Sequence, residues 1–460
     1  MKKIIVILFT FLFIVGCTNT NKDVNHFEAG QKYLDNFEYD EALTEFQSGI
    51  IKNPTDENNY LATAEIYSQK GAIDKATEIL KQGFSVNASN TISNSLGQIY
   101  LTRGDFEESM KWFESSILTD PNDIDAVKGK IKLLSLNNDT EGMKNYIVTI
   151  NSEIVDSELL IMKGILNLDD TKEASRLIVQ SNTVDDLNQD MSIELRMALT
   201  AYENAKTVHN LSEIIYILLN YGWYEVAQIP VTKVLNENPF YETAYVYQGL
   251  IYLHTSQYDK SIENFTKVQE LNPENVDSFI FHGQVLALKG DESNLFTLID
   301  GLLAKDNLEL TPSQYSTIQQ MYYDFGKFEQ IELLNTNFSE KIEINANAKL
   351  IYIDALIRLE KFNQADLIMK EITNIENLSL SEKAKLKSFE AITSYKLDRK
   401  QEGLDAIDEA EKIDNTVAIV HYIKGLILKD MGKTTEADIS FERAVELDLQ
   451  GNVTKLVNEK

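Results

Sequence analysis

Few side chains in this sequence have the types and spacings that catalysis or metal binding requires. The only cysteine is Cys17, so the chain can form neither an internal disulfide nor a cluster of thiolate metal ligands. The histidines are His26, His209, His254, His282 and His421. No two of them are four residues apart, which excludes the His-Glu-x-x-His zinc motif of a helix. We therefore expect no metal site and no bound cofactor.

Two short motifs carry part of a ligand-binding pattern but lack the rest. Met431-Gly432-Lys433-Thr434 contains the Gly-Lys-Thr of a phosphate-binding loop, yet the glycine required five residues earlier is Ile427, and the context is helical. Asp120-Pro-Asn-Asp-Ile-Asp lacks the glycine and the distal glutamate of a calcium loop. The sequence also has no Gly-x-Ser-x-Gly. It therefore predicts a protein that is not an enzyme and that binds no nucleotide.

The composition suits a long, acidic, helical chain. Of its 460 residues 43% are hydrophobic, and its six prolines and 20 glycines are few for a loop-rich or all-β protein of this size. The chain has 72 acidic and 43 basic side chains, a net charge of −29. Such a surface repels nucleic-acid phosphates and anionic lipid headgroups, so we expect no nucleic acid as partner and no membrane-binding face.

The N-terminus has the order of a secretory signal. Met1-Lys2-Lys3 is a basic start, and residues 4–15 form an apolar run broken only by Thr10. This run is too short to span a bilayer comfortably, because a spanning helix needs about 20 residues. The run leads into Ile14-Val15-Gly16-Cys17.

This ending resembles the bacterial lipoprotein signal, in which a small residue precedes an acylated cysteine. Ile14 stands where that family most often has leucine. The resemblance implies a signal peptide at residues 1–16 and lipidation of Cys17 by diacylglycerol and acyl groups such as palmitate. Residues 17–25 are then the lipidated cysteine and a polar tether. It also implies an extracytoplasmic protein held by lipid on the outer face of the plasma membrane, or in an outer membrane if the cell has one.

The region from Pro239 to Pro273 predicts a pair of helices. Two helical patterns are separated by the polar break Thr255-Ser256-Gln257. The apolar faces of the two patterns contain Tyr245, Gly249 and Tyr252, and then Tyr258, Ser261, Phe265 and Val268. Steps of three and four residues mark amphipathic helices, and the interval between the two prolines is about 34 residues. The region therefore resembles a tetratricopeptide (TPR) repeat.

The same pattern recurs along most of the chain. It predicts an N-terminal TPR array at residues 26–122 and a C-terminal array at 208–451, followed by a frayed tail at 452–460. Residues 123–207 are either degenerate repeats or a helical insertion. The fold class that the resemblance implies is all-α, a right-handed superhelical solenoid of antiparallel helix pairs with about 12 units. Four of the six prolines share one repeat position, namely Pro54, Pro121, Pro239 and Pro273.

Two prolines carry local predictions of their own. Pro230 lies inside a predicted helix, where a missing N–H and a steric clash predict a kink or a break. Thr311-Pro312 predicts a helix start, with threonine as the cap and proline in the first turn.

In TPR proteins the first helix of each unit lines a concave face that holds a peptide or a partner helix. The resemblance implies these groove residues: Gln31, Glu65, Gln98, Tyr216, His254, Gln284, Tyr323, Asp354 and Arg358. One TPR subclass binds chaperone C-terminal carboxylates through lysine, arginine and asparagine. The matching positions here are Phe27, Gln31, Thr91 and Ser95, so that clamp is absent from the N-terminal repeats.

The sequence thus predicts a membrane-anchored, non-enzymatic scaffold that binds proteins or peptides of the bacterial cell envelope. An alternative is an accessory factor of a polysaccharide export or glycan-handling system, because lipidated TPR arrays also occur there. A third hypothesis, much less favoured, is a catalytic role for residues 123–207.

Overall fold

The structure, a computed structural model, describes residues 25–137, 139–150, 156–184, 188–339, 342, 344–372, 378–448 and 451–458. This part of the chain contains 26 α-helices and no strands. None of these helices is long and apolar enough to cross a bilayer. The predicted signal peptide, Cys17 and most of the tether lie outside the described residues. The all-α fold class is confirmed.

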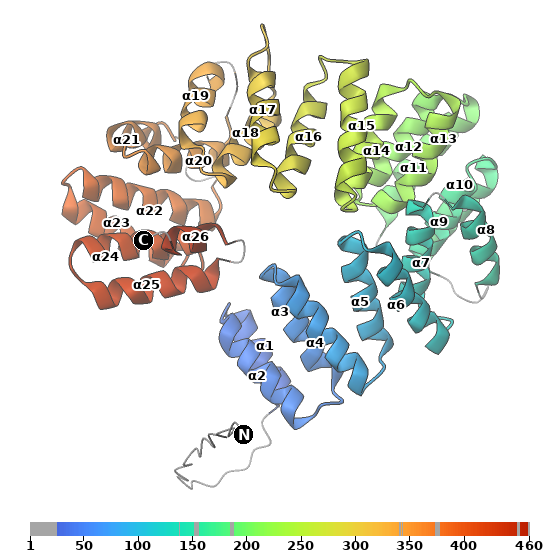
Figure 1. The fold of residues 1–460 in the computed structure, drawn as a ribbon, viewed down its shortest axis with the longest axis horizontal. Helices are drawn as coiled ribbons and strands as arrows, with labels where there is room; N and C mark the ends of the chain where they lie inside the picture. Colours follow the sequence, from blue (N-terminus) through green and yellow to red (C-terminus); the bar gives the residue numbers. More distant parts are fainter. Residues whose placement is uncertain are drawn as a thin grey trace, which may run out of the picture.

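The helices form three consecutive parts, which we call the N-terminal arm, the hub and the C-terminal arm (Figure 1). The N-terminal arm comprises α1 (His26–Asp35), α2 (Tyr39–Lys52), α3 (Glu57–Gln69), α4 (Ile73–Val86), α5 (Asn90–Thr102) and α6 (Phe106–Thr119). The hub comprises α7 (Ile124–Leu136), α8 (Thr140–Thr149), α9 (Ser157–Leu166), α10 (Thr171–Ser181), α11 (Gln189–Asn204), α12 (Val208–Asn220) and α13 (Tyr224–Glu237).

The C-terminal arm is the longest part. It comprises α14 (Glu242–His254), α15 (Tyr258–Leu271), α16 (Val276–Leu288), α17 (Glu292–Leu303), α18 (Pro312–Asp324), α19 (Phe328–Phe338), α20 (Ala346–Arg358), α21 (Phe362–Lys370), α22 (Leu380–Lys396), α23 (Lys400–Ile413), α24 (Ala418–Asp430), α25 (Thr434–Leu447) and α26 (Asn452–Asn458). Among the described helices, consecutive ones form twelve pairs, α1–α2 to α9–α10 and α12–α13 to α24–α25, with α11 and α26 outside them. The predicted stack of helix pairs is confirmed.

A left-handed residue ends the first helix of most pairs. Gly71 has φ 69°, and the two backbone hydrogen bonds that surround it run from Gly71 N to Ser68 O (3.0 Å) and from Ala72 N to Tyr67 O (2.8 Å). This is the Schellman arrangement, which satisfies the last carbonyls of a helix and turns the chain sharply. Glycine fits this position because it has no Cβ, yet Glu360 adopts φ 56° at the equivalent turn.

Close helix crossing within a pair depends on a small residue that faces an aromatic ring. A Cβ on Gly249 would lie 2.5 Å from Cε1 of Phe265, and Ser261 Oγ donates a hydrogen bond to Gly249 O at 2.7 Å. The glycine–phenylalanine pairs with this geometry are Gly30–Phe46, Gly97–Phe113, Gly249–Phe265 and Gly425–Phe441. The small residue therefore lets the two helices of each of these pairs cross closely.

The hub does not continue the stack in one direction but folds back on itself. Helix α13 packs against α7 and α9, and Ser135 Oγ on α7 donates to Glu225 O on α13 at 2.5 Å. Lys233 on α13 pairs with Asp169, just before α10, at 2.8 Å. Helix α11 packs between α10 and α12 and belongs to no pair. The hub therefore redirects the chain, and the two arms curve toward each other (Figure 1).

The fold-back brings the two arms into contact. Ser256, in the α14–α15 turn, donates a hydrogen bond from Oγ to the carbonyl of Thr102 at the end of α5, at 2.5 Å. At the far ends, Lys70 on the N-terminal arm and Arg443 on the C-terminal arm line one open cleft of about 940 Å³. The solenoid thus approaches a ring.

Three local predictions have different outcomes. Thr311 caps α18 in a full capping box with Gln314, and Pro312 occupies the first turn, as predicted. Helix α13 runs through Pro230 without the expected break. Residues Asn452–Asn458 of the expected frayed tail form α26 instead, because apolar side chains such as Val453 find a core to pack against.

Candidate functional site

The candidate site is the inner face of the two arms, which contains three hollows. We call them the N-terminal basin (about 800 Å³), the middle basin (about 660 Å³) and the C-terminal basin (two adjoining cavities of about 410 and 260 Å³). Their walls come mainly from the first helices of successive pairs: α3, α5 and α7, then α14, α16 and α18, then α18, α20, α22 and α24. This is the concave face that the repeat pattern implies.

The N-terminal basin combines an apolar floor with amide, hydroxyl and charged groups. Glu65 on α3 and Gln98 on α5, both predicted groove residues, line it, together with apolar residues such as Leu61 and Phe113. Such a mixture can pair with the main chain of an extended peptide and also accept apolar side chains.

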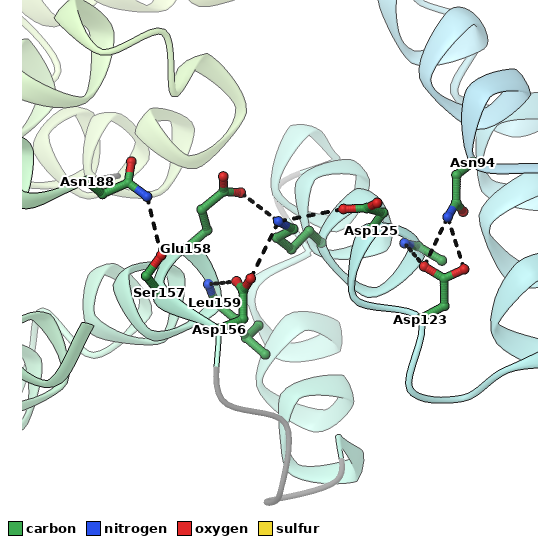
Figure 2. A network of polar contacts seen from close by, with 10 residues as sticks. Asn94, Asp123, Asp125, Asp156, Ser157, Glu158, Leu159 and Asn188 are labelled. Carbon is green, nitrogen blue, oxygen red and sulfur yellow. Dashed lines mark hydrogen bonds and ion pairs between the residues drawn. The ribbon is translucent and has the colours of Figure 1, made fainter. Parts of the chain in front are cut away.

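Lys128 holds one wall of this basin in place. Its Nζ lies 3.0 Å from Glu158, and 3.7 Å from both Asp156 and Asp125 (Figure 2). Burial acts to lower the pKa of Lys128, but the hydrogen bond to Glu158 and the nearby carboxylates outweigh it, so the pKa is raised. Lys128 is therefore charged at neutral pH, and it ties α7 to α9.

A second network fixes α5, α6 and α7 at the same basin. Asp123 accepts a hydrogen bond from Asn94 Nδ2, at 3.0 Å to each oxygen (Figure 2). It also caps α7 by accepting from Ala126 N, and it accepts from Ser116 Oγ at 2.7 Å. Sequence reasoning missed both networks. The acidic run around Asp123, set aside because it is not a calcium loop, contains an N-cap signal that predicts the hydrogen bond from Ala126 N in the second of them.

The middle basin contains two of the predicted residues, His254 and Gln284. The His254 ring stacks on Tyr224 with centroids 3.9 Å apart and an interplanar angle of 7°. Burial lowers the pKa of His254, so the ring is neutral at pH 7. His254 therefore joins α14 to α13 by packing, and Gln284 supplies the polar group further along the basin.

The C-terminal basin brings three predicted residues together. Tyr323 on α18 donates a hydrogen bond from its hydroxyl to Asp354 on α20. Arg358 donates from Nε and Nη2 to the same carboxylate at 3.1 and 3.4 Å, and its guanidinium lies 5.5 Å from the ring centre of Tyr422. The side chains of Asp354 and Arg358 are only 4% and 14% exposed, so this is a nearly buried ion pair on the inner face.

Burial and neighbouring charge act on this cluster in a consistent way. Burial and the Asp354 carboxylate raise the pKa of Tyr323 well above its usual range, so its hydroxyl stays protonated and donates. Burial acts to lower the pKa of Arg358, but Asp354 outweighs it and the pKa is raised. The cluster thus keeps one negative and one positive charge, each satisfied by the other.

The remaining predicted residues lie apart from these basins. Gln31 is half-buried on α1, and Tyr216 is 50% exposed on α12; neither lines any of the three basins. Cys17 lies outside the described residues. Within the described residues, no group of three or more His, Cys, Asp or Glu side chains is placed to hold a metal ion.

Comparison with known proteins identifies the repeats. The tetratricopeptide repeat family model matches residues 92–123, 243–275 and 418–450. These segments cover α5–α6, α14–α15 and α24–α25. A comparison with curated proteins gives no match.

The solved structures that resemble the chain are low in identity. The APC/C hetero-tetramer Cut9-Hcn1 gives 12% identity and a TM-score of 0.35, over 94% of this chain and 95% of that one. Yeast Tom70 gives 15% and 0.33, over 95% and 98%. A tetratricopeptide repeat protein from Parabacteroides merdae gives 14% and 0.32, over 57% and 97%. The family matches and the stacked helix pairs together show that this chain is an all-α solenoid that contains tetratricopeptide repeats.

Proposed function

We propose that this protein is a non-enzymatic scaffold that binds polypeptide partners along its inner face and is held to the outside of a bacterial membrane by lipid on Cys17. A tetratricopeptide solenoid suits a protein-binding scaffold, because stacked pairs present an extended concave surface. The observation that carries the proposal is the set of three basins, which the first helices of successive pairs line in both arms.

The chemistry of the basins favours polypeptide. In the N-terminal basin, Glu65 and Gln98 stand beside apolar floor residues. In the middle basin, Gln284 stands beside Phe281 and Leu250. Proteins usually bind an extended segment in this way: a polar group forms hydrogen bonds with its main chain, and an adjacent apolar hollow accepts its side chain.

Site-specific photo-crosslinking tests this proposal. A benzophenone amino acid at Gln98 or Gln284 should trap a polypeptide in cells, because both positions line basins. The matched control is Leu118, which is 86% exposed on α6, a second helix of its pair. Polypeptide adducts from Gln98 and Gln284 but not from Leu118 support the proposal. Equal adducts from Leu118 contradict it, and recovery of glycan alone favours the polysaccharide-export alternative.

The membrane anchor needs a separate test. The support for it is the sequence Ile14-Val15-Gly16-Cys17 after a short apolar run. Because the acyl chains supply the membrane affinity, Cys17→Ala should release the protein from the membrane fraction. The control is Thr18→Ala, which leaves the cysteine in place. If the Cys17→Ala protein stays with the membranes to the same extent as the control, the lipid anchor is wrong.

A further inference from the structure

The C-terminal basin is already occupied in part by the chain's own last described helix. Helix α26 packs against α24 and α25. Val453 is 8% exposed and belongs to the same apolar core as Leu350 and Ile419, residues of the basin wall. Leu456 and Val457 are half-buried against that core. The three apolar side chains follow one another at i, i+3 and i+4, so they form one face of the helix.

Lys455 is the one charged side chain of α26, and it also lines the basin. Lys455 and Leu456 line the smaller cavity together with Tyr323, Asp324 and Arg358. Burial raises the pKa of the Asp324 carboxyl at the rim, and the hydrogen bond from Gln320 and the positive charge of Lys455, which lines the same cavity, act against that rise. The basin therefore selects a helix with an apolar face and a basic side chain at its edge.

Helix α26 fills this basin poorly. Cavities of about 410 and 260 Å³ remain beside it, and Val453 lines both of them. The helix has only seven residues, and an isolated helix of that length does not persist in water. Its connection to α25 turns at Gly451, with φ 77°, and Thr454 N donates to Asp448 at 2.7 Å. A helix this short, beside two cavities that it leaves unfilled, is easily exchanged for a longer one.

We propose that the C-terminal basin is a docking site for an amphipathic helix of a partner protein, and that α26 is a built-in occupant which that helix displaces. The partner helix carries apolar side chains at i, i+3 and i+4 and a basic residue that faces Asp324. This inference rests on the proposed function and specifies one part of it. The N-terminal and middle basins, where no helix of the described residues plays this part, take extended segments instead.

Peptide binding to the full chain tests the proposal. The probe is a fluorescein-labelled synthetic peptide of residues 448–460, and the readout is fluorescence anisotropy. In the unaltered chain the tethered α26 competes at a high effective concentration, so the peptide binds weakly. Leu456→Asp puts a charge on the apolar face of α26 without changing the basin walls that the other helices contribute. This variant should bind the peptide at least tenfold more tightly than the unaltered chain.

Matched variants make the result specific. Asn458→Asp adds the same charge at an exposed position of α26 and should leave binding as weak as in the unaltered chain. A peptide that itself carries Leu456→Asp should not bind any of the three proteins. Leu456→Ser, a milder change, is measured in parallel, with circular dichroism to verify that each variant is folded.

Two outcomes overturn the proposal. If folded Leu456→Asp and Leu456→Ser proteins bind the peptide no better than the unaltered chain, α26 is only a structural cap. If the Asn458→Asp protein binds the peptide as tightly as the Leu456→Asp protein does, the tighter binding does not come from release of the apolar face of α26. Crosslinking from Gln98 and Gln284 reports on the other two basins, so a failure here leaves the proposed function standing on its own test.

Discussion

Replacing Gly249 by alanine tests the crossing of α14 and α15 most directly. The added Cβ would lie 2.5 Å from Cε1, 2.8 Å from Cζ and 2.9 Å from Cδ1 of Phe265. Phe265 is fully buried and also packs against Phe281, with ring centroids 5.7 Å apart, so its ring has little room to move. Alanine gains about 1 kcal/mol in helix propensity over glycine, whereas overpacking a core costs about 1–3 kcal/mol. The clash is severe, so we expect a net loss of about 1–2 kcal/mol.

Gly301→Ala is the matched control for this change. Gly301 lies inside α17 with open space around the position of a Cβ, so alanine there should stabilise by about 0.5–1 kcal/mol. Repeat arrays do not always unfold in one step, so the assay is native-state hydrogen exchange, read at the amides of α14 and α15 for Gly249→Ala and at those of α16 and α17 for Gly301→Ala. A loss of about 1.4 kcal/mol makes their exchange about tenfold faster.

A second variant separates the clash from other causes. Phe265→Leu in the Gly249→Ala background removes the ring that the methyl group meets, so the two changes together should cost less than the sum of the single changes. The reasoning is refuted if Gly249→Ala slows exchange as Gly301→Ala does. It is also refuted if the free-energy losses of Gly249→Ala and Phe265→Leu simply add in the double variant.

Three further predictions follow from local features. Glu360 holds φ 56° at a position where six equivalent turns have glycine, so Glu360→Gly should stabilise the α20–α21 pair by about 0.5–1 kcal/mol in hydrogen exchange. Asp354→Ala should lower the free energy of unfolding by about 3–5 kcal/mol, because it leaves Arg358 buried without a counter-charge. The double change Asp354→Leu with Arg358→Met should lower it clearly less, and thermal unfolding measures both. Burial lowers the pKa of His254 below 6.5, so the unfolded chain binds a proton more readily than the folded chain does. The free energy of unfolding should therefore rise with pH up to about 6.5 and then level off. This dependence on pH should be weaker in the His254→Phe protein.

Features that depend on neighbours in sequence were predictable. The cap at Thr311 and the first-turn proline form a signal four residues long. The Gly249–Phe265 contact repeats at a fixed spacing, so one unit identified the others. Tyr323, Asp354 and Arg358 were each selected by their place on a first helix, but their mutual hydrogen bonds were not foreseen. The hydrogen bond from Tyr323 to Asp354 joins two successive helix pairs, α18–α19 and α20–α21. The rotation between successive pairs depends on side-chain packing, which a local sequence pattern does not reveal.

The fold-back of the hub was not predicted, because it joins segments about 90 residues apart, such as Ser135 and Glu225. One sequence signal was nevertheless present. Helix α9 is apolar on all sides, with eight of its ten residues buried, whereas a helix in a regular stack shows a polar face. Such a helix needs a cover on its outer side, and α13 provides it. Helix α26 was missed for another reason: seven residues carry too little periodicity, and its helicity comes from the core it meets.

The hub also determines how partners reach the inner face. Without the fold-back, the N-terminal and middle basins would be separated by the whole length of the hub. With it, Thr102 of the N-terminal basin is hydrogen-bonded to Ser256 of the middle basin, so the two hollows adjoin at this contact between the arms. One partner segment that fills one basin therefore places its next residues at the other, where their effective concentration is high. Weak contacts in each basin then add, which suits recognition spread over many repeats better than a single deep site.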